Sequence, residues 1–244
     1  MMERMMIIGC TSGIGLALAE LSIAQGFLVG GVGRNADKLE ELEQKFPHRF
    51  FGEIADIRHA ENLSGHLDLL VQKTGGMDIC VVASSIARKN KELDFSIEQD
   101  VLRTNVLGYA SALVWAARYF QKQNYGHLIG LTSLAKFLGS PNPAYTASKA
   151  FESRYLDGLR LNLAKTNVTV SEVMPGFVRT PMTENQGKMF WAISAEKAAG
   201  CILKAMRRKK QKVVISWRWK LFYCLLPHIP FTVLKRVLSQ PEME

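Results

Sequence analysis

The sequence predicts an α/β fold: a single doubly wound domain whose seven-stranded parallel sheet is flanked by helices, followed by a short basic-aromatic helical tail. Short apolar runs alternate with amphipathic stretches of helical length, which is the order of βαβ units. The apolar runs are continuous rather than alternating, as in strands that are buried on both faces. The 244 residues, of which 48% are hydrophobic, are enough to build one large core.

The predicted elements follow one another from the N-terminus. Strands are expected at residues 5–8, 27–32, 50–54, 78–82, 127–131, 168–173 and 213–216. Helices are expected at residues 16–25, 35–46, 97–121 and 145–164, the third of them as one long helix, with a further helix near 195–205. No repeat or linker interrupts this pattern. Residues 1–216 are therefore expected to form the domain and residues 217–244 a C-terminal helical extension.

A glycine-rich segment, Gly9-Cys10-Thr11-Ser12-Gly13-Ile14-Gly15, joins the first strand to the first helix. In this position glycines permit a tight turn and a close approach of the backbone to a pyrophosphate, and the helix N-terminus offers free N–H groups. A plain strand-to-helix turn is the alternative. Asp56 follows the third strand, where its carboxylate either accepts a hydrogen bond from an adenine amino group or is simply solvated.

The end of the second strand bears on the choice of cofactor. A carboxylate about 20 residues past the glycines would hold the ribose hydroxyls of NAD. This position reads Gly33-Arg34, and no carboxylate follows before Asp37. The Arg34 guanidinium is suited to a 2′-phosphate. The sequence therefore predicts NADP(H) in preference to NAD(H), with a free surface arginine as the alternative.

Four residues in the second half of the chain are candidates for catalysis. Tyr145 and Lys149 are four residues apart, so they share one face of a helix. A nearby ammonium favours the phenolate and eases proton transfer by a tyrosine. Ser133 ends the fifth strand, where its hydroxyl is suited to hold a substrate carbonyl oxygen. Asn105 lies in the long predicted helix. Each residue alone is weak evidence, whereas the combination is specific.

With these motifs the sequence resembles the short-chain dehydrogenase/reductase family over residues 5–181, with the glycine motif, the asparagine of TNVLG, the serine, YTASK and MPGFVRTPM in order. The resemblance implies a Rossmann-type fold and an NAD(P)(H)-dependent oxidoreductase acting on a carbonyl or secondary alcohol. It implies that Tyr145 is the acid/base, that Lys149 holds the nicotinamide ribose and tunes Tyr145, that Ser133 orients the carbonyl, and that Asn105 positions a water. The cofactor-binding residues it implies are Gly9, Thr11, Ser12, Gly13, Ile14, Gly15, Arg34, Asp56, Ile57, Ala83, Ser84, Tyr145, Lys149, Pro175, Gly176, Val178 and Thr180.

Two positions depart from the family pattern. The family's NNAG at the end of the fourth strand reads Val82-Ala83-Ser84-Ser85, so two bracing asparagines are missing, and Ile8 replaces a threonine. A nucleotide-binding sensor or scaffold protein with weak catalysis is therefore the alternative function. Residues after Ser84, at 134–142 and after Pro181 are mostly apolar, which favours a small or lipid-like hydrophobic substrate. The resemblance also implies a homodimer or homotetramer.

The positive charge is concentrated in the tail. Residues from Cys201 onward carry ten Lys/Arg and two Asp/Glu, a charge of +8, out of +9 for the whole chain. The run KAMRRKKQK at 204–212 precedes WRWKLFYCLLPHIP, a mixture typical of peripheral membrane contact. Packing of the tail on the protein's own core or on a second subunit is the alternative, and no nucleic-acid module is recognised. No signal peptide, membrane span or metal-ligand spacing is found, so we expect a cytoplasmic, metal-free protein, with membrane association through the tail as the alternative to a fully dissolved one.

Overall fold

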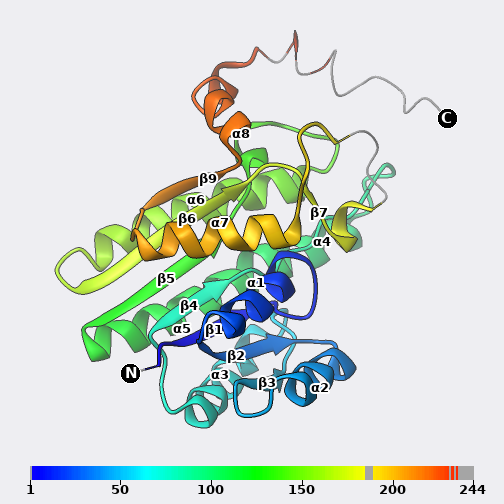
Figure 1. Ribbon diagram of the computed structural model, residues 1–244. Coiled ribbons are helices and arrows are strands. Elements are labelled where there is room, and N and C mark those ends of the chain that lie inside the picture. The colour runs from blue at the N-terminus through cyan, green and yellow to red at the C-terminus, as the bar shows by residue number, and fades with distance from the viewer. Residues whose placement is uncertain (1, 185–188, 231, 234, 236–244) are drawn as a thin grey trace.

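The computed structural model describes residues 2–184, 189–230, 232–233 and 235. Its centre is a seven-stranded, wholly parallel sheet in the order β3-β2-β1-β4-β5-β6-β9 (Figure 1). The strands are β1 (Arg4–Ile8), β2 (Leu28–Gly33), β3 (Phe50–Ile54), β4 (Ile79–Val82), β5 (Tyr125–Leu131), β6 (Asn167–Pro175) and β9 (Lys212–Ile215). The predicted fold class is confirmed, because each continuous apolar run became a strand covered on both faces.

Helices cover both faces of the sheet. They are α1 (Gly13–Ala24), α2 (Ala36–Lys45), α3 (Ala60–Thr74), α4 (Phe95–Leu102), α5 (Tyr109–Gln123), α6 (Pro143–Asn162) and α7 (Ala195–Arg207). One apolar cluster holds buried residues of α1, α2 and α7, and the other holds those of α3, α5 and α6. Figure 1 shows α1 and α7 side by side in front of the sheet. The sequence prediction did not include α3.

The long helix predicted at 97–121 is not regular. A π-helical turn, Arg103–Gly108, separates α4 from α5 while the helical run continues through it. Such a turn accommodates an extra residue and is frequent at functional sites. Gly108 at the end of this turn lets the helix backbone lie close to the backbone of Ile57, since a Cβ on Gly108 would lie 2.2 Å from the carbonyl oxygen of Ile57. Asn105 sits in this turn and is fully buried. The prediction of one uninterrupted helix was therefore wrong at the turn that contains Asn105.

A two-stranded sheet and two 3-10 turns complete the domain next to the carboxyl ends of the strands. β7 (Val178–Arg179) pairs with β8 (Ile193–Ser194), and a 3-10 turn at Pro181–Thr183 follows β7. A second 3-10 turn, Leu134–Phe137, follows β5. The sheet order reverses between β1 and β4, which lie side by side. In open α/β sheets this point opens a crevice at the carboxyl ends of the strands.

The tail begins at the carboxyl end of β9. It contains α8 (Trp217–Phe222) and a 3-10 turn, Leu226–His228, and the predicted helical extension beyond residue 235 lies outside the described residues. The basic run 204–212 lies at the other end of β9, roughly 13 Å away at about 3.3 Å per residue. The basic run and the aromatic segment, which are adjacent in sequence, therefore do not form one surface. Among the described residues, no helix combines the length and the apolar character needed to cross a bilayer.

Candidate active site

A pocket opens at the carboxyl ends of the central strands, around the reversal of strand order. With one exception, every predicted site residue lines it: Gly9, Thr11, Ser12, Gly13, Ile14, Gly15, Arg34, Asp56, Ile57, Ala83, Ser84, Ser133, Tyr145, Lys149, Pro175, Gly176, Val178 and Thr180. The exception is Asn105, which is buried behind the wall. The structure also brings Ser85, Ile86 and Met182 into the lining, from the segments after Ser84 and after Pro181 that were expected to border the substrate. Thr104, Leu131 and Thr132 line the pocket as well, although the sequence did not indicate them.

The glycine loop is tightly folded between β1 and α1. Gly9 has φ +94°, and its N–H donates to the carbonyl oxygen of Val32 at the end of β2. A Cβ on Gly15 would lie 1.9 Å from the carbonyl oxygen of Gly9, so only glycine fits there. The Ser12 side chain does not cap α1. The first-turn N–H groups of α1, which line the pocket, are therefore free to bind an anion such as a cofactor phosphate.

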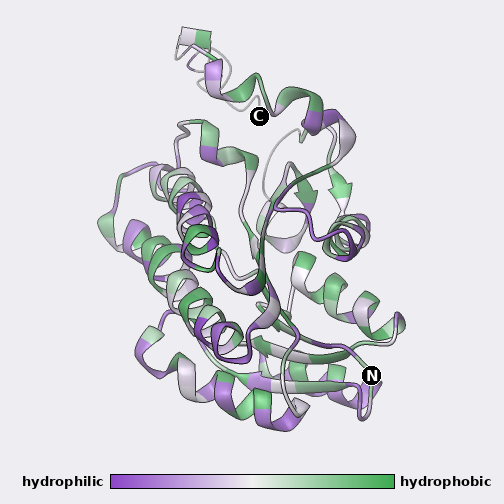
Figure 2. Cartoon of the chain, turned by 90° about the vertical axis from the view of Figure 1, so that its left-hand side faces the viewer, coloured by the Kyte–Doolittle hydropathy of each residue, from purple (hydrophilic) through white to green (hydrophobic). Residues whose placement is uncertain are grey.

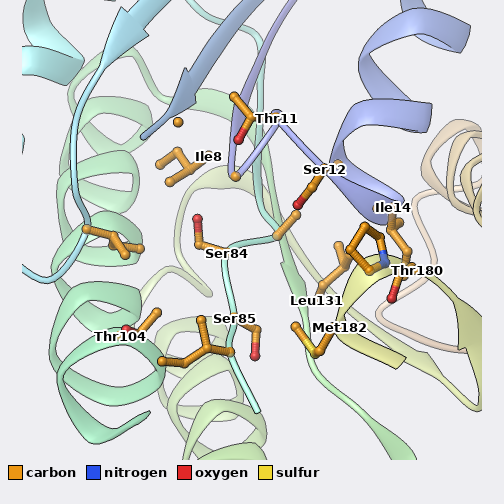
Figure 3. A pocket seen from close by; sticks show the side chains of 18 of the residues that line it. Ile8, Thr11, Ser12, Ile14, Ser84, Ser85, Thr104, Leu131, Thr180 and Met182 are labelled. Carbon is orange, nitrogen blue, oxygen red and sulfur yellow. The ribbon is translucent and has the colours of Figure 1, made fainter. Parts of the chain in front are cut away.

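The end of β4 keeps its place although the two asparagines of the family pattern are missing. The Ala83 N–H donates to the carbonyl oxygen of Ile8 over 2.8 Å. Ser84 packs so closely on Gly9 that a Cβ on that glycine would lie 2.6 Å from the Ser84 hydroxyl oxygen. Figure 3 shows Ser84 beside Ile8, with Ser85 further along the same segment. Backbone hydrogen bonding and close packing therefore hold Ala83 and Ser84 in place without the two asparagines of the family pattern.

Asn105 acts as a brace from behind the pocket wall. Its Oδ1 accepts hydrogen bonds from the Ile86 N–H at 2.9 Å and from the Ser85 hydroxyl at 3.3 Å. Its Nδ2 donates to the carbonyl oxygen of Ile86 at 2.9 Å and to the Ser148 hydroxyl at 3.0 Å. Ser148 precedes Lys149 on α6. Asn105 thus links the segment after β4 to the helix that carries Tyr145 and Lys149.

Ser133, Tyr145 and Lys149 all line the pocket. The Ser133 hydroxyl oxygen accepts a hydrogen bond from the Ala135 N–H at 3.1 Å, which leaves its own hydrogen available to donate. Tyr145 is half-buried in the first turn of α6. The Lys149 Nζ lies 5.6 Å from the centroid of the Tyr145 ring. The helical spacing of four residues therefore brings the two groups together as the sequence predicted.

Sequence reasoning missed the partner of Lys149. The Lys149 Nζ donates to both carboxylate oxygens of Glu152, at 2.8 and 2.9 Å, and both side chains are almost fully buried. Burial raises the pKa of the Glu152 carboxyl to about 7, against the lowering effect of Lys149, with Glu172 raising it further. The i,i+3 spacing on α6 was the available signal for this pair. Lys149 is thus held by a carboxylate just behind the pocket.

A second buried ion pair lies near the first. The Lys136 Nζ donates to Glu172 and to the Ser153 hydroxyl, at 2.6 and 2.7 Å. Burial lowers the pKa of Lys136, while its pairing with Glu172 opposes that change. The Tyr109 hydroxyl is buried without a hydrogen-bond partner among the described residues, and its pKa is raised by burial and by the charges of Glu152 and Glu172. The site is therefore backed by a charged interior rather than an apolar one.

Arg34 and Asp56, which also line the pocket, face one another. The Arg34 Nη1 lies 3.8 Å from the Asp56 Oδ2, and the Arg34 side chain is 54% exposed. Asp56 also accepts hydrogen bonds from the N–H and the guanidinium of Arg58, a residue not singled out in the sequence. Burial raises the pKa of Asp56, but the hydrogen bonds from Arg58 and the charge of Arg34 outweigh it and lower the pKa. Asp56 is therefore an ionised support for two arginines.

Comparisons with known proteins agree with this geometry. A family model described as short chain dehydrogenase matches residues 3–190. An uncharacterized oxidoreductase of Staphylococcus epidermidis is 33% identical over 181 residues, which cover 73% of this chain and 79% of the relative. An uncharacterized oxidoreductase of Myxococcus xanthus is 28% identical over 222 residues, 87% of each chain.

Solved structures share the fold. A short chain dehydrogenase from Burkholderia cenocepacia in complex with NADP superposes with a TM-score of 0.82 at 20% identity, covering 98% of each chain. ElxO with NADP bound superposes with a TM-score of 0.79 at 17% identity, covering 88% of this chain and 97% of that one. The matched family model includes both the glycine loop and the Tyr145–Lys149 pair, and the chain belongs to the short-chain dehydrogenase/reductase family of oxidoreductases.

Proposed function

We propose that the protein is an NADP(H)-dependent oxidoreductase that interconverts a carbonyl and a secondary alcohol on a small or lipid-like hydrophobic substrate. The observation that carries this proposal is that Ser133, Tyr145 and Lys149 line the same pocket as the glycine loop. The proton-transfer groups and the phosphate-binding loop are thus positioned at two parts of one continuous site. The loop fits a dinucleotide, since the first turn of α1 lines the pocket and is not capped by the Ser12 side chain, so its N–H groups are available to a phosphate.

In the reducing direction the cofactor supplies the hydride. The Ser133 hydroxyl donates to the substrate oxygen and holds it, and Tyr145 delivers a proton to that oxygen as negative charge develops. The ammonium of Lys149, 5.6 Å from the centre of the Tyr145 ring, stabilises the phenolate left behind. The reverse direction uses the same groups, with Tyr145 accepting the proton.

Arg34 supports the choice of NADP(H). It lies at the end of β2 with no carboxylate following it until Asp37, and its exposed guanidinium is available to a 2′-phosphate. The nearby Asp56 carboxylate also accepts hydrogen bonds from the Arg58 guanidinium. Its negative charge is therefore shared between two arginines and offsets only part of the charge of Arg34. Leu131, Ile86 and Met182 in the lining support an apolar substrate.

One observation favours a second candidate, a nucleotide-binding sensor or scaffold protein with weak catalysis. The bidentate contact with Glu152 offsets the charge of Lys149, and that charge is what would assist Tyr145. The two candidates differ in whether turnover depends on Tyr145.

The test is a panel of carbonyls and alcohols with NADPH, NADH and their oxidised forms, followed by the absorbance of the reduced nicotinamide. Tyr145→Phe should lower turnover at least about a hundredfold, since a positioned acid/base typically contributes 10²–10⁴-fold. NADPH binding, measured by calorimetry, should stay nearly unchanged because only the transferable proton is lost. Near-normal turnover by Tyr145→Phe on an accepted substrate would refute the assignment. Cofactor binding without turnover on any compound of the panel would favour the sensor.

A further inference from the structure

The tail segment from Trp217 to Leu226 has two apolar faces, and the protein's own core covers only one of them. The inward face consists of Trp219, Tyr223 and Leu226, spaced i, i+4 and i+7. Trp219 packs edge-on against Phe177 with ring centroids 5.8 Å apart. Leu226 is 7% exposed in an apolar cluster with residues of the 3-10 turn after β5 and of β6. This face anchors the segment to the domain.

The outward face consists of Trp217, Leu221 and Leu225, spaced i, i+4 and i+8. Their exposed fractions are 69%, 65% and 59%, which is unusual for three large apolar side chains in register. Figure 2 shows this part of the chain at the top, with hydrophobic and hydrophilic residues next to one another along it. A surface of this kind generally marks a binding site for another apolar partner.

Positive charge accompanies the outward face. Arg218 and Lys220 are exposed on α8, and the Arg218 guanidinium lies over the Trp217 ring at 5.5 Å from its centroid. No aspartate or glutamate occurs from residue 197 to residue 241. A twofold contact between two copies would bring these cations against themselves, whereas an anionic bilayer complements them. Tryptophan, leucine and basic residues on one short helix are typical of segments that lie in the lipid headgroup layer.

We propose that the outward face of α8 and its continuation, Trp217, Leu221 and Leu225 with Arg218 and Lys220, binds the surface of an anionic lipid bilayer. The apolar side chains enter the boundary between headgroups and acyl chains, and the two basic residues meet the phosphates. The surface lies outside the pocket, so this binding does not depend on the proposed reaction. The basic run at 204–212 is not part of the surface, because β9 separates the two.

The experiment is co-sedimentation of the full chain with vesicles of phosphatidylcholine alone or mixed with phosphatidylglycerol. The protein should pellet with the mixed vesicles and much less with the neutral ones, and less as salt is raised. The variant Arg218→Gln/Lys220→Gln should weaken binding about twenty-fivefold, at about fivefold for each basic residue near an anionic surface. Its matched control is Arg207→Gln/Arg208→Gln, which removes the same charge at the other end of β9 and should weaken binding less than about fivefold.

A third variant, Trp217→Ser/Leu221→Ser/Leu225→Ser, should abolish pelleting and keep the melting temperature, because these side chains make little contact with the core. If this variant does not fold, the comparison of the two charge variants still tests whether the outward face binds the bilayer. Equal losses in both charge variants would overturn the proposal, since attraction would then reflect net charge only. Recovery of the unaltered protein in the supernatant with both kinds of vesicle would also overturn it. A drop in oligomer mass for the third variant, by light scattering, would assign the face to a second copy of the chain.

Discussion

Replacing Glu152 by glutamine would leave the ammonium of Lys149 buried without its counter-charge. Both side chains are at most 3% exposed, and the two contacts are 2.8 and 2.9 Å long. Removing one partner of such a pair typically costs about 3–5 kcal/mol of the free energy of unfolding, because a charge is stranded away from water. For a domain of this size that corresponds to a drop in melting temperature of roughly 6–20 °C. Thermal and urea unfolding of Glu152→Gln measure this loss at about pH 8.5, above the Glu152 pKa of about 7, where the wild-type carboxylate is charged.

The chain offers a matched control. Lys38 and Glu41 form an ion pair with the same i,i+3 spacing and a 2.8 Å contact, but on the surface of α2. Glu41→Gln should cost less than about 1 kcal/mol, because water replaces the lost interaction. The double variant Glu152→Gln/Lys149→Met should recover part of the stability lost in Glu152→Gln, since it strands no charge. A loss below about 1 kcal/mol for Glu152→Gln, or no recovery in the double variant, would refute the reasoning.

The single variant Lys149→Met should behave differently, because Glu152 is able to neutralise itself by taking up a proton. Burial already raises the pKa of Glu152 to about 7 with Lys149 present, and without the lysine it goes higher. The unfolded chain has a glutamate pKa of about 4.3, so the folded form binds this proton more tightly. Below about pH 7 the folded wild type holds this proton as well, so the free energy of unfolding of Lys149→Met relative to wild type should change little there and should fall as pH rises from about 7 through 9. A relative stability that rises with pH over this range would contradict the burial of Glu152.

Two further predictions concern the cofactor end of the pocket. Arg34→Ala should weaken NADPH binding roughly ten- to a hundredfold and NADH binding little, as calorimetry would show, because a hydrogen bond to a charged group is worth about 1.5–3 kcal/mol; equal losses for both cofactors would exclude Arg34 as the selector. Gly15→Ala should destabilise the protein by at least about 1–3 kcal/mol, since its Cβ would meet the Gly9 carbonyl oxygen. Gly65→Ala, in the middle of α3 with open space around it, should instead stabilise by up to about 1 kcal/mol, and a similar loss in both would contradict the close approach at Gly15.

The strands and the pocket lining were predictable for a physical reason. Strands of a doubly wound sheet are buried on both faces, so each is a short apolar run, and all seven runs were found. Ligands bind at the carboxyl ends of such strands, so residues that directly follow a strand, such as Ser133, Arg34 and Asp56, were expected to converge. They do line one pocket. Their roles stay predictions.

Local irregularities were harder to predict. Helix α3 was missed although Leu63, Leu67 and Leu70 are spaced i, i+4 and i+7, because Ser64 and Gly65 within it have low helix propensity. The π-turn around Asn105 was missed because an average spacing near 3.6 residues does not reveal one extra residue. Neither error displaced a predicted strand, since each strand was predicted from its own apolar run and not from the neighbouring helices.

The two remaining errors show where sequence distance misleads. Lys149 and Glu152 look like an ordinary solvated pair on a helix, and only the packing of α6 against the sheet shows that both are buried. The basic run and the aromatic helix look like one amphipathic surface, yet the four residues of β9 carry the chain along the sheet between them. A strand advances about 3.3 Å per residue, more than twice the rise of a helix. Residues that flank even a short strand therefore lie at opposite edges of the sheet, and charge patterns that cross a strand should be divided there before a shared surface is inferred.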